Sequence, residues 1–138
     1  MGLPCSGAAI DPPTGGVDVL LIRVDFPDRP GDPVTEAAGQ AIFAQANQLI
    51  RDSSWGKFWF ENVDVTPTYR MPQASTYYAA LEEAGVCELA AAAVAAAADL
   101  FPVDEYWSYA VGFTSIGFPW AGLGYVAAGG VWLQGSGI

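Results

Sequence analysis

Apolar residues follow two different periods in the first part of the chain. The segment 17–26 has a run of leucine and β-branched side chains in its middle, which is typical of a strand buried on both faces. The proline-rich segment 27–33 predicts a loop, because proline cannot donate a ladder hydrogen bond. Helical spacing then predicts an amphipathic helix over residues 34–52, capped by Thr35 or Asp32. Its apolar positions are Ala38, Ile42, Ala46, Leu49 and Ile50.

Two signals mark the passage from this helix to the next strand. Gly56 follows the helix closely and suits the left-handed backbone conformation at which helices often end. Aromatic and β-branched residues over Val63–Tyr69 then predict a strand. Because Pro67 lacks a backbone N–H, we expect it at an edge position or at a bulge of that strand.

A second helical region occupies the middle of the sequence. It begins over Ser75–Glu83, and the pattern predicts an interruption at Gly85. The following segment, residues 88–99, is almost entirely alanine and leucine. Alanine has the highest intrinsic helix propensity, so this segment predicts a helix.

The last part of the chain predicts strands. Large residues alternate with smaller ones over Tyr106–Thr114, and the short apolar segments 122–127 and 130–133 alternate with glycine. The order of elements predicts an α/β fold, with two main helices on a twisted mixed sheet of four to five strands. We interpret residues 1–16, which are rich in glycine and proline, as a leader loop, and residues 17–138 as one unit.

Composition excludes several classes of protein and partner. Hydrophobic residues make up 52% of the chain, which argues against intrinsic disorder. No segment reaches the roughly 20 apolar residues that a membrane-spanning helix needs. The formal net charge of −10 repels phosphate backbones and anionic lipid surfaces. We therefore expect neither a nucleic acid nor a membrane as the partner.

Histidine and cysteine limit the chemistry further. The chain contains no histidine, so it cannot form an ordinary catalytic zinc site or a Ser-His-Asp triad. Cys5 and Cys87 allow at most one internal disulfide, which an extracellular setting would favour. Two unrelated thiols are the alternative.

Three groups of residues suggest a site but have a simpler structural explanation. Asp25, Asp28 and Asp32 share one loop and offer oxygen ligands for calcium, but their spacing fits no defined calcium motif, so a solvated acidic turn is favoured. Glu82, Glu83 and Glu88 belong to a solvated helix face. Aromatic residues that suggest a carbohydrate platform are more typical of a core. They are Trp55, Phe58, Trp59 and Phe60, and the same holds for Trp107, Trp120 and Trp132.

Six segments occur in an order that resembles a known family. They are VLLIRVDFPD at 19–28, SSWGKF at 53–58, VTPTYRMP at 65–72, the helix-to-strand link at 98–106, GLGYV at 122–126 and VWL at 131–133. Together they resemble the N-terminal part of the gametolysin and immune-inhibitor-A-like zinc metallopeptidases, which have the zincin fold. The resemblance covers residues 17–138 and identifies them as an N-terminal subdomain of a metallopeptidase catalytic domain.

The resemblance implies a secreted zinc endopeptidase that acts on protein or peptide substrates. In this family a His-Glu-x-x-His helix follows the segment that Trp132 matches, and it holds the zinc and activates the attacking water. The sequence stops before that motif, so this chain is expected to bind no metal and to have no proteolytic activity alone. Without the helix that should cover the sheet, we expect exposed apolar surface.

The same resemblance points to a substrate-binding strand. Zincins bind extended peptides by adding a strand to an exposed sheet edge, and the matching residues are Gly124, Tyr125, Val126 and Ala127. An ordinary hairpin at the rim of the fold is the structural alternative. Two other functions stay open: a non-catalytic module of degenerate zincin fold that binds protein or glycan, and a small secreted structural domain with one disulfide.

Overall fold

The computed structural model describes residues 14–31, 35–114, 116, 122–124 and 131–134, and of the last two segments we describe only the backbone. The strands are β1 (Gly15–Asp25), β2 (Phe58–Arg70), β3 (Ser108–Phe113), β4 (Gly122–Gly124) and β5 (Val131–Gln134). The helices are α1 (Glu36–Ser53), α2 (Ser75–Ala80), α3 (Glu83–Ala97) and the 3-10 turn η1 (Val103–Glu105). This arrangement confirms the predicted α/β class.

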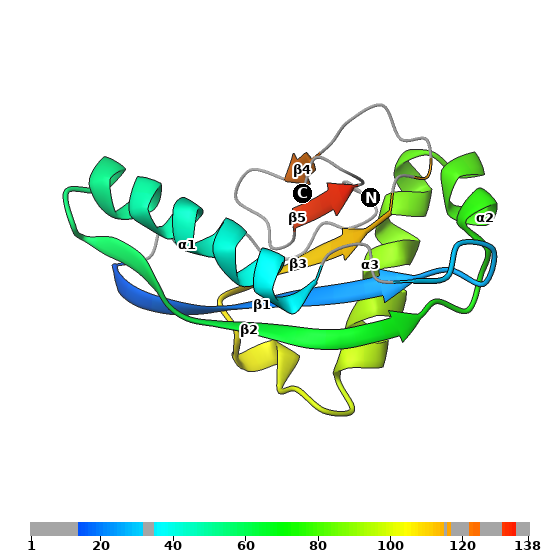
Figure 1. Ribbon diagram of the computed structural model, residues 1–138, viewed down its shortest axis with the longest axis horizontal. Coiled ribbons are helices and arrows are strands. Elements are labelled where there is room, and N and C mark those ends of the chain that lie inside the picture. The colour runs from blue at the N-terminus through cyan, green and yellow to red at the C-terminus, as the bar shows by residue number, and fades with distance from the viewer. Residues whose placement is uncertain (1–13, 32–34, 115, 117–121, 125–130, 135–138) are drawn as a thin grey trace.

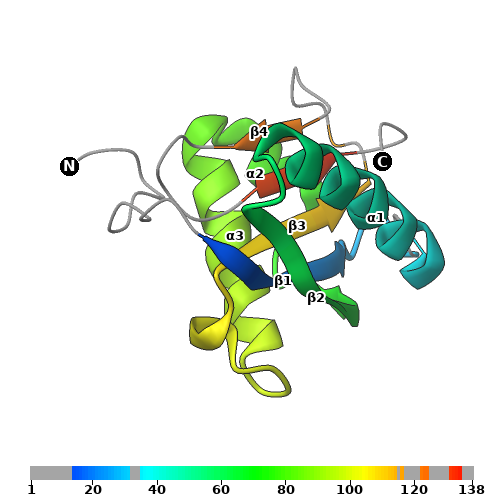
Figure 2. The ribbon, with the colours of Figure 1, turned by 90° about the vertical axis from the view of Figure 1, so that its left-hand side faces the viewer.

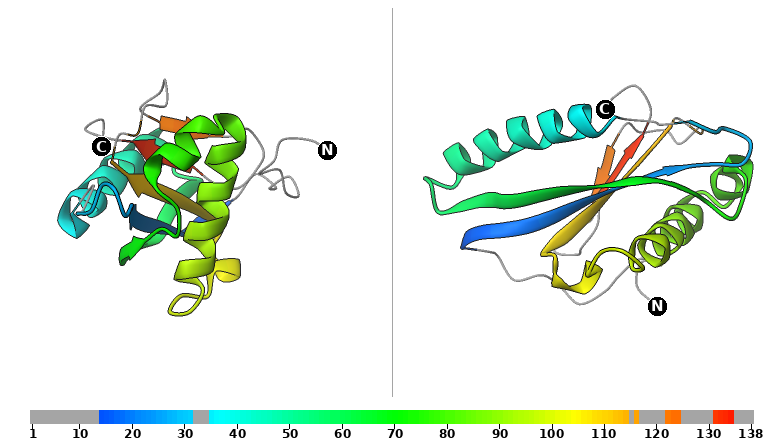
Figure 3. Two further views of the ribbon diagram at one scale, coloured as in Figure 1. Left: turned by 90° about the vertical axis from the view of Figure 1, so that its right-hand side faces the viewer. Right: turned by 60° about the horizontal axis from the view of Figure 1, so that its bottom comes forward.

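The sheet is built around β1 (Figure 1). Its strand order is β2-β1-β3-β5-β4, so β2 and β4 are the two edge strands (Figure 2). The strands β2, β1 and β3 form a parallel core, β5 continues it in parallel with β3, and β4 is antiparallel to β5. The helix α1 lies on one face of the sheet and α3 on the other (Figure 3).

Strand β1 is buried on both faces, as the sequence predicts. Alternate side chains point to opposite faces of a strand, so Leu20, Ile22 and Val24 pack toward α3, whereas Leu21 packs toward α1. All four are fully buried. Burying one such side chain contributes about 1.5–3 kcal/mol, so this strand is a main source of stability.

Two predicted turn residues are confirmed at the ends of α1. The Thr35 hydroxyl accepts a hydrogen bond from the Ala38 N–H at 3.1 Å and so caps the first turn. Gly56 has a φ of 74°, in the left-handed region. Trp55 also has a positive φ, of 60°, which the sequence pattern did not indicate.

The strand predicted over Val63–Tyr69 is longer than expected and has Pro67 where the sequence placed it. Pro67 lies on the edge strand β2, beside an irregularity at which Leu21 pairs with Val65 but Arg23 pairs with Thr68. The buried Thr66 side chain fills the irregularity: its hydroxyl accepts from the Arg23 N–H at 3.0 Å and donates to the Pro67 carbonyl at 2.7 Å.

The predicted interruption at Gly85 is wrong. The break between α2 and α3 lies at Leu81 and Glu82, where Glu82 has a φ of 54°, and Gly85 lies inside α3. A Cβ at position 85 would collide with the carbonyl oxygen of Tyr78 on α2. Gly85 is therefore explained by the close approach of two backbones and not by a helix end.

We predict that Gly85→Ala lowers the stability of the fold by about 2 kcal/mol, because the added methyl group must push α2 away from α3. Gly39→Ala is the matched control on α1. Its Cβ would crowd the flexible end of Leu21 and meet Val65 at ordinary van der Waals distance, with no backbone atom in the way, so a loss below about 1 kcal/mol is expected. Urea unfolding of both variants tests this, and equal losses would contradict the backbone clash.

Candidate functional site

The edge strand β4 ends at Gly124, which is the first residue of the predicted substrate-binding segment. β4 pairs in antiparallel register with β5, with Leu123 opposite Trp132 and Gly124 opposite Val131. It is the last strand in the sheet order, so in the described part of the chain its outer side has no strand partner. Gly124 therefore lies at a sheet edge, whereas Tyr125, Val126 and Ala127 fall outside the described residues. An edge strand presents backbone N–H and C=O groups to which an extended peptide can pair.

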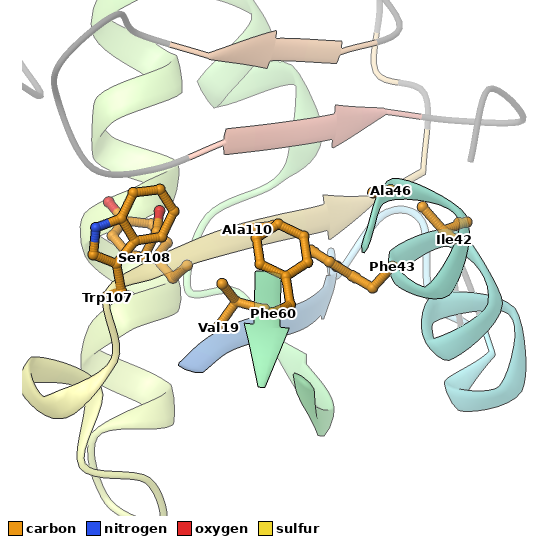
Figure 4. A pocket seen from close by; sticks show the side chains of 9 residues that line it. Val19, Ile42, Phe43, Ala46, Phe60, Trp107, Ser108 and Ala110 are labelled. Carbon is orange, nitrogen blue, oxygen red and sulfur yellow. The ribbon is translucent and has the colours of Figure 1, made fainter. Parts of the chain in front are cut away.

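An apolar cavity of about 220 Å³ lies between α1 and the sheet (Figure 4). Ile42, Phe43 and Ala46 line it from α1, and Phe60 extends toward Phe43 from β2, with ring centroids 5.8 Å apart. An engineered apolar cavity of about 150 Å³ is large enough to bind benzene, so the volume is considerable for a small domain.

The apolar stripe of α1 continues past the cavity into solvent. Leu49 lies on the same stripe as Ile42 and Ala46, yet 67% of its surface is exposed. On the opposite face of the sheet, α3 covers a continuous core that includes Val111 and Phe113. Among the described residues, the α1 face of the sheet is therefore less completely covered than the α3 face.

Asp25, at the carboxyl end of β1, forms an ion pair with β2. Its carboxylate accepts from Arg70 Nε at 2.7 Å and from the Gly31 N–H at 2.9 Å, and only 6% of the residue is exposed. The hydrogen bond from Arg70 lowers the pKa of Asp25, and burial opposes it with a smaller effect. Asp25 is thus held as a carboxylate that joins the ends of two strands and the following loop.

Asp28 connects the same loop to α2. Its two carboxylate oxygens accept from the Ser75 N–H at 2.7 Å and from the Ser75 hydroxyl at 2.6 Å, and these bonds lower its pKa. Ser75 is the first residue of α2, and the N-cap residue Ala74 has no side-chain acceptor, so Asp28 satisfies this helix end. The third residue of the calcium alternative, Asp32, lies outside the described residues. Asp25 thus bonds Arg70 and Gly31, whereas Asp28 bonds Ser75, so each carboxylate has its own structural partners.

The aromatic residues between α1 and β2 divide into two groups. Phe58 and Phe60 are half-buried and in edge-to-face contact, with Trp107 against Phe58. The core assignment is wrong for Trp55, which is 89% exposed because the left-handed turn between α1 and β2 directs its side chain off the end of the helix. Trp59 instead lies under the Arg51 guanidinium at 5.5 Å and donates to Glu61 at 2.6 Å.

Trp120 lies outside the described residues, and Trp132 is placed by its backbone on β5. Of the glutamates on the second helical region, Glu82 and Glu88 are exposed, and the Glu88 carboxylate accepts from the Tyr77 hydroxyl at 2.7 Å. The solvated face predicted for them agrees with these two positions.

The sequence contains few of the residues that usually bind zinc. The sequence has no histidine, and Cys87 is disulfide-bonded, with Cys5 as the only other cysteine of the sequence. Within the described ranges, no three histidine, cysteine or acidic side chains come together in a group that would hold a metal ion. No step of metal-assisted chemistry is therefore assigned to these residues.

Sequence reasoning missed the residues that bond the edge strand β2. Gln40, Asn47 and Ser54 are polar positions beside the apolar stripe of α1, and their side chains bond backbone groups of β2. These three polar residues are spaced by seven positions, which is about two helical turns, and this spacing could have indicated that they lie on one side of the helix.

Comparison with known proteins identifies no relative of this chain. No protein-family model matches the sequence, and no significant match was found among curated proteins or solved structures. Within the described residues, none of the helices has the length and apolar character needed to cross a bilayer.

The Asp25–Arg70 pair predicts acid sensitivity. Because the pKa of Asp25 is lower in the folded state, its stabilisation is complete above the unfolded pKa of about 3.9 and is lost as the pH falls through the folded value. Arg70→Met should lower the unfolding free energy at neutral pH, because it leaves the Asp25 carboxylate without its charged partner, and should weaken the pH dependence below about pH 4.

Melting temperatures of the wild type and of Arg70→Met, measured from neutral pH down to about pH 3, test the role of the pair. Lys57→Met is the control, since it removes an exposed positive charge that contacts neither Asp25 nor Asp28. Parallel curves for the wild type and Arg70→Met would show that another group controls the acid sensitivity.

Proposed function

We propose that this chain forms the N-terminal part of a secreted zinc metalloendopeptidase of the zincin fold, and that its edge strand β4 binds the peptide substrate. The proposal rests on the order of the six segments described above. The structural observation that supports it best is the position of β4, the outermost and antiparallel strand of the sheet.

The binding mode follows from backbone hydrogen bonding. A peptide in extended conformation can pair with the outer side of β4 and so continue the sheet by one strand. Backbone hydrogen bonds hold such a peptide largely independently of its sequence, while side-chain pockets select residues at alternate positions. In this proposal the chain orients the substrate, and a helix outside this sequence supplies the zinc, the activated water and the general base.

The incompletely covered α1 face gives further support. The resemblance implies a helix after the last strands, and a helix that packs beside α1 would cover the apolar cavity and the exposed Leu49. Ile42, Phe43 and Ala46 would then contact that helix. Covering apolar surface stabilises a domain by roughly 25 cal/mol for each Å² removed from water.

The coding DNA downstream of Ile138 decides whether the zinc-protease proposal can hold. A His-Glu-x-x-His motif within the next few tens of codons would supply the missing metal ligands and the general base. A stop codon directly after Ile138 would overturn the catalytic proposal. The non-catalytic binding module would then be the preferred function, with the β4 edge as its binding surface.

The role of the edge strand is tested in the complete zinc-loaded enzyme. Val126→Pro should raise the KM for peptide substrates several-fold, because proline removes a backbone donor from the proposed binding edge. The loss of one hydrogen bond that contributes about 1 kcal/mol corresponds to a roughly fivefold increase in KM. Val126→Ala is the matched control, since it shortens the side chain but keeps the N–H. Unchanged kinetics in Val126→Pro, or equal effects in both variants, would contradict substrate pairing.

A further inference from the structure

At the other edge of the sheet, side chains of α1 and of its C-cap residue bond the first half of β2. In a parallel pair, alternate residues of a strand direct their N–H and C=O groups away from the partner strand. At the start of β2, Phe58 and Phe60 direct their groups outward in this way, and both have their N–H and their C=O bonded by a side chain of α1 or of its cap.

Each of the two contacts reproduces the hydrogen bonding of a neighbouring strand. The Asn47 carboxamide accepts from the Phe60 N–H at 2.9 Å and donates to the Phe60 carbonyl at 3.1 Å. The Ser54 hydroxyl accepts from the Phe58 N–H at 3.0 Å and donates to the Phe58 carbonyl at 3.1 Å. In each contact, one side chain thus bonds both the N–H and the C=O of a β2 residue, as a residue of a neighbouring strand would do.

A third residue continues the series along the strand. Gln40 Nε2 donates to the Val63 carbonyl at 3.0 Å. Asn47 follows Gln40 by seven residues, and Ser54, the C-cap residue, follows Asn47 by seven. Seven residues are close to two turns of an α-helix, so the three side chains lie on one side of α1, along β2. We call these three residues the edge ladder.

The strand behind the ladder has the composition of an association-prone edge. Its first residues are Phe58, Trp59 and Phe60, followed by Val63 and Val65, and aromatic and β-branched residues have the highest strand propensity. An edge strand with such residues is a template for pairing with another chain unless it is protected. In a solution of the pure protein, β2 of a second copy of the chain is available for such pairing.

We propose that the edge ladder prevents β2 from pairing with β2 of a second copy. In the first half of β2, the ladder occupies outward backbone groups of Phe58, Phe60 and Val63 that an antiparallel β2–β2 dimer about a two-fold axis would need. It also leaves β4 as the edge at which an extended partner can add. This inference does not depend on the zinc-protease proposal, because it concerns the opposite edge and only residues of this chain.

The first test is amide hydrogen exchange of the full 138-residue chain at low protein concentration. Asn47→Ala should increase the exchange rate of the Phe60 amide about tenfold, because that N–H loses its acceptor. The matched control is Gln48→Ala, which removes a neighbouring amide that bonds Asp52 within α1 and does not touch β2. Equal exchange of the Phe60 amide in the wild type and in Asn47→Ala would overturn the ladder.

The second test is self-association by sedimentation velocity at physiological ionic strength. Asn47→Ala and the double variant with Ser54→Ala should dimerise at concentrations at which the wild type and Gln48→Ala have the same, smaller size. The exchange of the Phe58 and Phe60 amides in the variants should then slow as the concentration rises. If the double variant loses its far-ultraviolet circular dichroism, Ser54→Ala alone is used. Ladder variants that associate no more than Gln48→Ala would overturn the proposal.

Discussion

The pairing of β1 with strands on both sides is the constraint on which the rest of the structure depends. Once β2 and β3 bond both edges of β1, its side chains can reach water on neither face, because Leu20 and Ile22 pack under α3 and Leu21 packs under α1. The helices are therefore needed on both faces. Parallel neighbours also bring the carboxyl ends of β1 and β2 together, where Asp25 meets Arg70.

The sequence predicted the elements whose pattern is local. The continuous apolar run of β1, the helical spacing on α1 and the alanine content of α3 can each be recognised within a short segment, and the structure has the predicted elements there. Thr35 and Gly56 were recognisable because capping and left-handed turns depend on the residue itself.

The features that sequence reasoning missed depend on contacts between distant segments. Gly85 looks like a helix breaker in the sequence, but its role is set by the Tyr78 carbonyl on another helix. Asp28 looks like part of an acidic loop, yet it caps the helix that begins 47 residues later at Ser75. Trp55 shows the converse error, because an aromatic residue is usually buried, whereas a left-handed turn at the end of α1 leaves no apolar surface beside it.

The two edges of the sheet differ in a way that bears on function. At β2 an irregular register, a proline and the α1 side chains all oppose the addition of another strand, whereas the described part of β4 is a short strand bonded on one side only. A protein that binds extended peptides at one edge needs this asymmetry, since an open second edge would let copies of the protein pair with each other. The edge ladder therefore matters for any function in which β4 binds a strand, whether the complete protein cleaves that strand or only holds it.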